Sequence, residues 1–473
     1  MNLPVDFENS LQSLSKLYYN TYDNDDDDDF DIFKQFAQKN YELSYLDKTP
    51  SSVINEIKEK YSYYLSRFVR EQKHSIPSLI LPKKYTTGYI TDVDAFINPK
   101  EKKSLLRNST MKKYEVETDD YVYSNYPQLQ QYIPRGLAIY EIYENETEEK
   151  EFFDIGVYAN KKFTGMTKQD DDDKVDINKF CIEDINKNTD KLITMEKVNG
   201  EAFHVAGRYI KDNFYYFIGS KKSHIMIQHK DDIHLYQAER LKNTKKFATS
   251  FMNFLNCSLS LDKIEILKNL LHYTKCTMVY EILQPSYQHI VPIDEIQDKF
   301  VFLMFSSPYN NNATLTAFPP HIANKVIRVL NIETAQYNIH DSWNLDKIIK
   351  DTRMDNNTEG IVLYYLNKNN QTICLLKLKT FWYIFLRALR MKANYFIFNK
   401  EAATILNNEQ IKTSINKKFD DISKDFQYDD EPTLQYYKDK AFAFIKWVKS
   451  SQNNTKFKTS FPILWREFCK LNP

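Results

Sequence analysis

The sequence predicts an α+β fold in which a domain built on antiparallel β-sheet lies between a largely helical N-terminal region and a helical C-terminal domain. The chain has 473 residues, 42% of them hydrophobic and 15% aromatic, which is enough to bury the cores of two or three domains. Strand-like segments alternate with helical ones only in the middle of the chain, whereas both ends show helical periodicity.

The N-terminal region is predicted to span residues 1–115. Its acidic run from Asp23 to Phe30 is typical of a solvated loop. The segment KEKYSYYLSRFVREQKH, residues 58–74, interleaves basic residues with tyrosines. We expect an amphipathic helix there, and contact with RNA is the alternative interpretation.

The central domain is predicted to span residues 116–392. Segments rich in β-branched and aromatic residues predict strands at 135–143, 192–198, 214–219, 224–229, 277–283, 289–293, 300–305, 360–366 and 372–379. Helical spacing predicts helices within 235–255, 264–273, 322–330 and 342–351. The acidic run from Asp170 to Asp173 is expected to be an exposed insertion.

The C-terminal domain is predicted to span residues 393–473 and to be helical. Helical patterns cover 382–396, 400–411 and 434–451, and no strand pair lies between them.

Composition limits the class of protein. Lys plus Arg and Asp plus Glu each number 64, so any nucleic-acid site must be a local patch. The five cysteines are scattered, which argues against structural zinc and is typical of a reducing compartment; we expect them to be buried thiols without a role. No apolar run reaches the roughly 18 residues of a membrane span. We therefore expect a soluble intracellular protein, cytoplasmic or nuclear.

The first candidate functional residue is Lys197, in the segment KVNG that ends a predicted strand. The chain has only eight glycines, and one of them, Gly200, lies three residues after this lysine. A glycine there leaves room for a ligand to approach the backbone. Taken alone, the pattern is more typical of a surface turn.

Other charged residues lie within or at the ends of predicted strands. Glu359 precedes Gly360 at the start of one strand, and Lys377 and Lys379 alternate on the next, so both lysines share a face. Two lysines on one strand face require solvent or an anionic partner. Glu281 lies in an apolar strand, where a carboxylate is costly unless it is hydrogen-bonded or the strand is at an edge.

Arg135 precedes another of the scarce glycines, in YIPRGLAIYE. Its guanidinium is suited to a phosphate.

In this order, the segments KVNG, YEILQPSYQHIV, EGIV and KLKTFWY resemble the motifs of the covalent nucleotidyltransferase superfamily of RNA ligases, DNA ligases and mRNA-capping enzymes. The phage-type tRNA-repair RNA ligases look closest, because the Arg135 strand and the KKFTG segment that contains Lys162 are similar to elements of that branch. The match spans roughly Tyr132 to Arg390. The resemblance implies that the central domain is an antiparallel-sheet nucleotidyltransferase, or adenylation, domain.

The resemblance also implies an ATP-dependent RNA ligase that joins 3′-OH and 5′-phosphate ends through a lysyl-AMP intermediate, with ATP and Mg²⁺ or Mn²⁺ as cofactors. Lys197 would be the nucleophile. Lys377 and Lys379 would act at the phosphates and Glu359 at the metal. The remaining ATP-binding residues would be Arg135, Lys162, Glu196, Asn199, Gly200, Glu281 and Phe302, with Glu281 at the ribose, Glu196 at the adenine edge and Phe302 stacked on the base.

One position departs from the family pattern, because Asn199 stands where aspartate is usual. It is the one feature that favours a catalytically inactive RNA-binding pseudo-ligase. An mRNA-capping guanylyltransferase is a second alternative, although the C-terminal motif of that class has no counterpart here.

The expected partner is RNA with 5′-phosphate and 3′-OH ends, with broken tRNA as one candidate in RNA repair or tRNA splicing. An end-healing enzyme is a candidate partner protein. We expect a monomer that does not contact a membrane.

Overall fold

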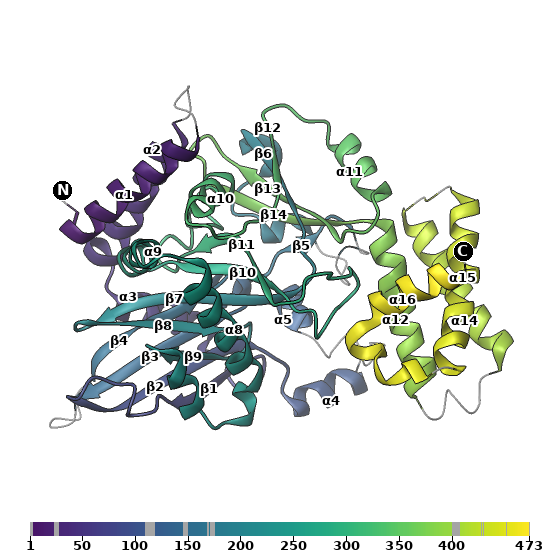
Figure 1. Cartoon of the computed structure of the whole chain (residues 1–473), viewed down its shortest axis with the longest axis horizontal. Coiled ribbons are helices and arrows are strands. Elements are labelled where there is room, and N and C mark those ends of the chain that lie inside the picture. Colours follow the sequence, from purple (N-terminus) through teal and green to yellow (C-terminus); the bar gives the residue numbers. More distant parts are fainter. Residues whose placement is uncertain are drawn as a thin grey trace.

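A computed structural model describes residues 3–22, 28–108, 119–144, 150–167, 170, 176–399, 407–426, 428, 430–450 and 452–472. Figure 1 shows three sheets with helices around them and a separate group of helices at the C-terminal end of the chain. The α+β prediction is confirmed, with antiparallel sheets and helical regions at both ends. Among the described helices, none combines the length and the apolar character that crossing a bilayer requires.

The first sheet has four antiparallel strands in the order β1-β2-β3-β4. They are β1 (Val69–Ser75), β2 (Tyr85–Ala95), β3 (Leu137–Glu144) and β4 (Lys150–Tyr158). Helices α3 (Pro50–Ser62), α4 (Pro99–Asn108), α5 (Asp119–Asn125) and α6 (Pro127–Tyr132) belong to the same part of the chain. The pairing of β2 with β3 crosses the predicted domain boundary near residue 115, which itself stays a prediction.

The helix predicted over residues 58–74 is wrong. Helix α3 ends at Ser62, and β1 begins at Val69 with only that residue fully buried. A strand of sequence VREQKHS at the edge of a sheet buries little apolar surface, so its sequence lacks the alternation that identifies strands.

The second sheet has five antiparallel strands in the order β11-β10-β7-β8-β9. They are β7 (Glu201–Ile210), β8 (Asn213–Gly219), β9 (His224–Ile227), β10 (Thr277–Leu283) and β11 (Lys299–Ser306). Five of the described helices pack around this sheet: α8 (Lys242–Ser258), α9 (Leu261–Thr274), α10 (Pro320–Val329) and the N-terminal helices α1 (Val5–Thr21) and α2 (Asp29–Glu42). Helix α2 continues into a π-helical turn, η1 (Leu43–Asp47). Side chains of α1 and α2 share one hydrophobic core with this sheet.

The third sheet has the order β12-β6-β13-β14-β5 and is antiparallel except for the short β14–β5 pair. Its strands are β5 (Thr164–Gly165), β6 (Lys191–Glu196), β12 (Tyr337–His340), β13 (Gly360–Leu366) and β14 (Thr372–Lys379). Near it lie α7 (Ile185–Asn188), α11 (Leu345–Met354) and the 3-10 turn η3 (Ile177–Phe180). Two more 3-10 turns, η4 (Lys230–Leu235) and η5 (Glu239–Leu241), precede α8.

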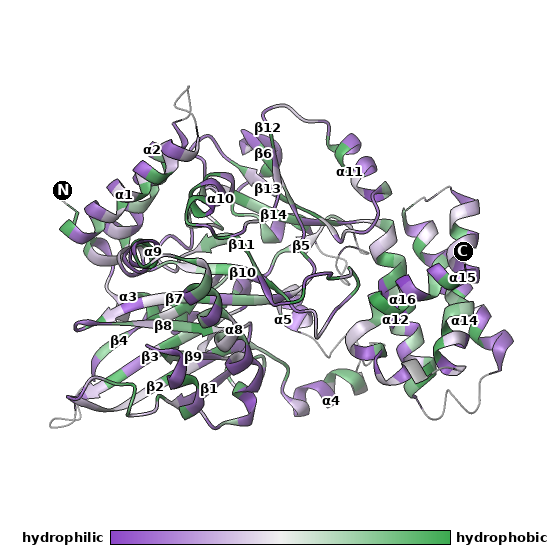
Figure 2. Ribbon diagram, viewed as in Figure 1, coloured by the Kyte–Doolittle hydropathy of each residue, from purple (hydrophilic) through white to green (hydrophobic). Residues whose placement is uncertain are grey.

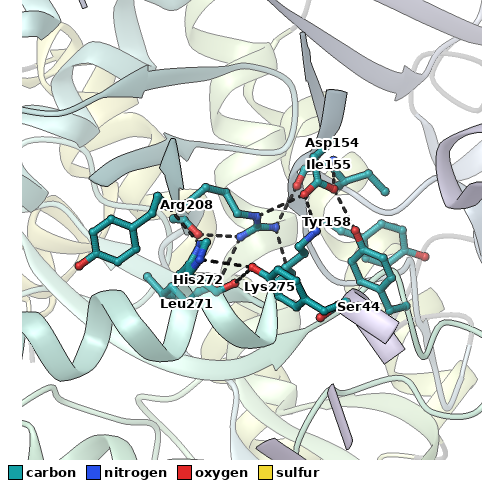
Figure 3. Close-up of polar contacts among 12 residues, drawn as sticks. Ser44, Asp154, Ile155, Tyr158, Arg208, Leu271, His272 and Lys275 are labelled. Atoms are coloured by element: carbon teal, nitrogen blue, oxygen red, sulfur yellow. Dashed lines mark hydrogen bonds and ion pairs between the residues drawn. The ribbon is translucent and has the colours of Figure 1, made fainter. Parts of the chain in front are cut away.

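A buried ion-pair cluster joins the first two sheets (Figure 3). Asp154 on β4 pairs with Lys275 at 2.9 Å, and the guanidinium of Arg208 on β7 donates to the carbonyls of Ile155 and Leu271. The ion pair and the hydrogen bonds of the terminal nitrogens of Arg208 offset part of the cost of burying these charges, and they connect the two sheets.

The C-terminal helices form their own hydrophobic core. They are α12 (Phe381–Phe398), α14 (Asn408–Phe426), α15 (Glu431–Ser450) and α16 (Phe457–Leu471). The 3-10 turn η6 (Gln452–Thr455) lies between α15 and α16. Figure 2 shows hydrophobic and hydrophilic residues interleaved along these helices, as expected of helices that pack on one face. Helix α12 begins before the predicted boundary at residue 393 and packs with this domain.

Three further expectations are corrected. The segment 289–293 forms no strand but an irregular connection after β10. Cys181 and Cys374 form a disulfide, and Cys257 is exposed, so among the cysteines only Cys276 is a fully buried free thiol.

The acidic runs also differ from the prediction where they are described. Asp170 is completely buried and pairs with Arg353, so it is not part of an exposed loop, and Asp171–Asp173 lie outside the described residues. In the first run, residues 23–27 lie outside the described residues, and Asp29 starts α2 and pairs with Lys325.

Candidate active site

Lys197 lies in the four-residue connection between β6 in the third sheet and β7 in the second. Its backbone N–H donates to the carbonyl of Gly360 at 2.8 Å, which ties the connection to the start of β13. Its Nζ lies 2.8 Å from Oε1 of Glu359, and about a fifth of the side chain is exposed. The amine is therefore held at the junction of two sheets and remains accessible.

Glu359 is almost fully buried at the start of β13. Burial favours the neutral acid, but the positive charges of Lys197 and Lys379 and the hydrogen bonds from Lys197 and Asn199 outweigh it, so the pKa of Glu359 is lowered. The carboxylate is thus ionised at neutral pH.

Gly360 sets the backbone next to this carboxylate. Its φ is +131°, and a Cβ atom there would lie 2.1 Å from the carbonyl oxygen of Leu378 on β14. No L-residue fits both conditions. One of the scarce glycines is therefore required where Glu359 enters the site.

Asn199 connects three segments through its side-chain amide. Its Oδ1 accepts from the backbone N–H groups of Ile290 and Val291 at 3.1 and 3.0 Å. Its Nδ2 donates to Oε2 of Glu359 at 2.7 Å and to the hydroxyl of Tyr383 at 3.3 Å. An amide supplies both the acceptor and the donor that this position requires, whereas a carboxylate would face another carboxylate.

Gly200 and Glu281 join the connection to β10. The backbone N–H of Gly200 donates to Oε1 of Glu281 at 3.0 Å, and a Cβ atom at Gly200 would lie 2.3 Å from the carbonyl oxygen of Ile282. Burial of the carboxylate raises the pKa of Glu281, and Lys197 and Lys221 act in the opposite direction. The predicted grouping of Lys197, Asn199, Gly200, Glu281 and Glu359 is thus present as one cluster.

The two lysines of β14 lie on one face of the strand. The Lys379 side chain is nearly buried, with its amine 5.6 Å from the ring centroid of Tyr383 and close enough to Glu359 to affect its pKa. Lys377 is half-buried, with its amine 4.9 Å from the ring centroid of Phe163.

Asp170 and Arg353 hold the backbone of Lys379. Asp170 accepts from the Lys379 N–H at 2.8 Å and from both terminal nitrogens of Arg353, which in turn donates to the Lys379 carbonyl. Neither residue was predicted, because a buried ion pair between residues 183 positions apart leaves no local pattern.

A cavity of about 630 Å³ opens in front of Lys197. One wall contains Lys197, Asn199, Gly200, Glu281 and Glu359. A second wall belongs to the C-terminal helices, with Tyr383, Arg387 and Arg390 of α12 and Lys458 of α16, and the lining also includes His289 and Lys221. This second wall was not predicted, although the spacing of Tyr383, Arg387 and Arg390 places them on one helix face.

Neither Arg135 nor Lys162 lines this cavity. Arg135 lines a neighbouring cavity of about 230 Å³ and forms a fork with Asp119 at 2.9 and 3.1 Å, while Lys162 pairs with Asp120 at 2.6 Å. Lys221 lines both cavities. Loss of water around its amine, together with the charges of Arg135 and Lys197, lowers the pKa of Lys221 although the residue is exposed.

Glu196 and Phe302 are not brought to the cavity. Glu196 is exposed at the end of β6, and its backbone N–H donates to the carbonyl of Gln336. Phe302 has no exposed surface and packs against Tyr280 and Phe305 in the core. A ring without exposed surface offers no face to a base, so the structure does not support the predicted stacking role of Phe302.

The carboxylates of the cavity limit the kind of metal site that it can form. Within the described ranges, no group of three or more His, Cys, Asp or Glu side chains is placed to hold a metal ion. Mg²⁺ commonly keeps several waters and takes one or two carboxylates together with substrate phosphates. Glu359 and Glu281, which line one cavity, fit that kind of site but not a cage made of protein ligands alone.

The comparisons with known proteins give neighbours only among solved structures. No family model matches the sequence, and no curated protein matches it. An archaeal ATP-dependent RNA ligase aligns with a TM-score of 0.37 and 11% identity, covering 66% of this chain and 68% of the ligase. A putative ATP-dependent DNA ligase from Aquifex aeolicus aligns with a TM-score of 0.37 and 11% identity over 67% of this chain and 75% of its own.

A third neighbour is a mutant RNA ligase of Naegleria gruberi with ATP and Mn. It aligns with a TM-score of 0.29 and 12% identity, covering 42% of this chain and 53% of its own. These three neighbours are thus ligases of RNA or DNA that use or contain ATP.

Proposed function

We propose that this protein is an ATP-dependent RNA ligase that acts through a covalent lysyl-AMP intermediate on Lys197. The observation that carries the proposal is the cluster at the cavity wall, where Lys197 contacts the ionised Glu359 and lies beside Asn199, Gly200 and Glu281. An accessible amine held next to a carboxylate, in a cavity with further cations, is suited to attack a phosphoric anhydride.

In the first step, the neutral amine of Lys197 attacks the α-phosphorus of ATP. A P–N bond forms, the P–O bond to the β-phosphate breaks, and pyrophosphate leaves. A lysine amine has an ordinary pKa of about 10.4, so it must lose a proton before it attacks. Glu359, at 2.8 Å, is placed to keep the amine oriented and to accept that proton.

Negative charge builds on the phosphate oxygens during this step. Lys379, whose charge acts on Glu359, and Lys377 on the same strand face are the side chains we assign to its stabilisation. A divalent ion bound at Glu359 would neutralise the triphosphate. Glu281, held by the Gly200 N–H, is assigned to the ribose hydroxyls.

The next two steps regenerate the lysine and join the ends. The RNA 5′-phosphate takes the AMP, so that the P–N bond breaks and an RNA-adenylate anhydride forms. A 3′-OH then attacks the 5′-phosphate, the phosphodiester forms, and AMP leaves. Repair of broken RNA, with tRNA as one substrate and an end-healing enzyme as a partner, is the role we assign to this reaction.

Asn199 motivates the alternative of an inactive RNA-binding pseudo-ligase. Its amide makes four hydrogen bonds that a carboxylate could not all make. It is therefore adapted to the local network, which favours a working site.

The proposal is tested by intact mass measurement after incubation with Mg²⁺ and either ATP or GTP, with Lys197→Ala as the control. We expect an increase of one AMP with ATP, none in the control, and joining of nicked or single-stranded RNA by the adduct. A GMP adduct would indicate a capping guanylyltransferase. A folded protein without any adduct, either as purified or after incubation, would contradict the proposal and leave the pseudo-ligase.

A further inference from the structure

One face of α12 lines the cavity that contains Lys197. Tyr383, Arg387, Arg390, Met391 and Asn394 follow one another at intervals of three, four or one residue, which places them on a single side of the helix. Helix α12 is anchored to the catalytic cluster, since the Tyr383 hydroxyl bonds to the amide of Asn199. Thr380 caps its first turn by accepting from the Tyr383 N–H.

Arg390 fixes the geometry of this wall. Its guanidinium donates to the carbonyl of His289 at 3.2 Å and to the carbonyl of Lys458 at 3.0 Å. It therefore joins α12 to the connection after β10 and to the start of α16. We treat Arg390 as a positioning residue because its donors are used in these contacts.

Arg387 lies one helical turn beyond Tyr383 and one turn before Arg390. Arg387 lines the cavity, and its charge acts on the Tyr383 hydroxyl, which is bonded to the amide of Asn199. An arginine at this position offers a planar set of donors to an anion in the cavity.

His289 supplies a neutral hydrogen-bonding group next to this wall. Burial and the charge of Arg390 lower its pKa to about 4, so the imidazole is neutral at pH 7. Its buried Nε2 atom has no hydrogen-bond partner among the described residues, and its nearest carboxylate, Glu201, lies 3.9 Å away. A neutral imidazole in the cavity lining can take part in hydrogen bonds without adding charge.

The charges of the lining also indicate an anionic ligand. The cavity contains five cationic side chains, Lys197, Lys221, Arg387, Arg390 and Lys458, against the two carboxylates of Glu281 and Glu359. Because Glu359 is paired with Lys197, the excess positive charge lies toward the C-terminal helical domain and Lys221.

We propose that Arg387, in the cavity lining that also contains His289, forms a second phosphate site in the cavity of Lys197. The inference rests on the proposed function and extends it, because it makes the C-terminal helical domain part of the reaction site. The ligand chemistry is a terminal phosphate group, which has two sources in this reaction. These are the β- and γ-phosphates that leave as pyrophosphate and the 5′-phosphate of the RNA that receives AMP.

Equilibrium binding in a Lys197→Ala background tests the site without depending on catalysis. The probes are inorganic pyrophosphate, a 5′-phosphorylated RNA oligonucleotide and the same oligonucleotide with a 5′-OH. Adding Arg387→Gln should weaken binding of at least one phosphate probe by roughly tenfold to a hundredfold, the range expected for a charge-assisted hydrogen-bonded contact. Arg387→Lys should restore part of this loss.

The matched control is Lys446→Gln, which removes one positive charge from an exposed position on α15 of the same domain. A loss limited to pyrophosphate assigns the site to the nucleotide, and a loss limited to the 5′-phosphorylated RNA assigns it to the nucleic-acid end. Equal binding of both phosphate probes by Arg387→Gln and by the control would overturn the inference. Failure of the proposed function has a different signature, namely no AMP adduct in the wild-type chain.

Discussion

The side-chain amide of Asn199 holds the carboxylate of Glu359 from the side opposite to Lys197. Asn199 Nδ2 donates to one carboxylate oxygen at 2.7 Å, and Lys197 Nζ contacts the other at 2.8 Å. Glu359 is therefore fixed at both oxygens between the nucleophile and a neutral group that is itself tied to two backbone amides.

Asn199→Asp should destabilise this arrangement. The new carboxylate would replace the donor that faces Glu359, and two carboxylates at this distance cannot both ionise without cost. In metal-free buffer we expect a loss of about 1–3 kcal/mol in the free energy of unfolding at pH 8, and a smaller loss at pH 5, where one of the acids can bind a proton. Urea titrations at the two pH values measure the difference, and an equal loss at both would contradict the expected repulsion.

Glu281→Gln and Glu359→Gln should change the pH dependence of stability in opposite directions. The pKa of Glu281 is raised, so its ionisation costs stability as the pH rises above its ordinary value near 4.5. The pKa of Glu359 is lowered, so its ionised form contributes stability above about 4.5 that is lost as the pH falls through the lowered value.

Relative to the wild type, Glu281→Gln should therefore become more stable, and Glu359→Gln less stable, when the pH is raised from 4 to 7. Denaturant midpoints at both pH values give the comparison, and each variant serves as the control for the other. A shift of the same sign in both variants would show that the two carboxylates do not differ as the structure indicates.

Gly360→Ala should cost more stability than Gly88→Ala. Gly360 has φ +131° and backbone atoms 2.1 Å from the new Cβ, whereas at Gly88 the closest atoms are side-chain methyls at 3.1 and 3.2 Å and φ is not positive. We expect a loss of roughly 1–3 kcal/mol or more at Gly360 from backbone strain alone, together with a large loss of AMP adduct. Thermal melting of both variants tests this, and equal melting temperatures would contradict it.

Asp170 and Arg353 should be strongly coupled in stability and in adduct formation. Removing one partner leaves a buried charge, which costs about 3–5 kcal/mol, whereas removing both leaves none. Asp170→Asn/Arg353→Gln should thus be more stable than either single variant. All three should form the AMP adduct more slowly than wild type, because the backbone of Lys379 loses its anchors. Additive free energies in a double-mutant cycle would exclude the coupling.

Much of the fold could be predicted because the inner strands carry long runs of β-branched and aromatic residues. Strand β7 was not predicted, since His204, Gly207 and Arg208 interrupt its apolar pattern. Contacts with distant segments hold them: His204 Nδ1 lies 3.4 Å from His224 Nε2, and a terminal nitrogen of Arg208 donates to the carbonyls of Ile155 and Lys275. Such partners are far away in the sequence and leave no local signal.

The candidate site could be predicted only in part, because local patterns reveal some of its residues and packing between distant segments places the others. Lys197, Gly200, Glu359 and Lys379 lie next to strand ends or scarce glycines, which local patterns reveal. Arg387 reaches the cavity because α12 packs beside the connection after β10, and His289 lies in that irregular connection; periodicity encodes neither arrangement.

The most direct test of the account is to locate the AMP after the protein has been incubated with ATP and digested into peptides. Lys221 lines the same cavity as Lys197, and the pKa of Lys221 is lowered, so Lys221 is the competing nucleophile. Mass spectrometry should find the AMP on the peptide that contains Lys197, linked to that side chain. AMP on Lys221, or on no lysine of the cavity, would contradict the assignment of Lys197 as the nucleophile.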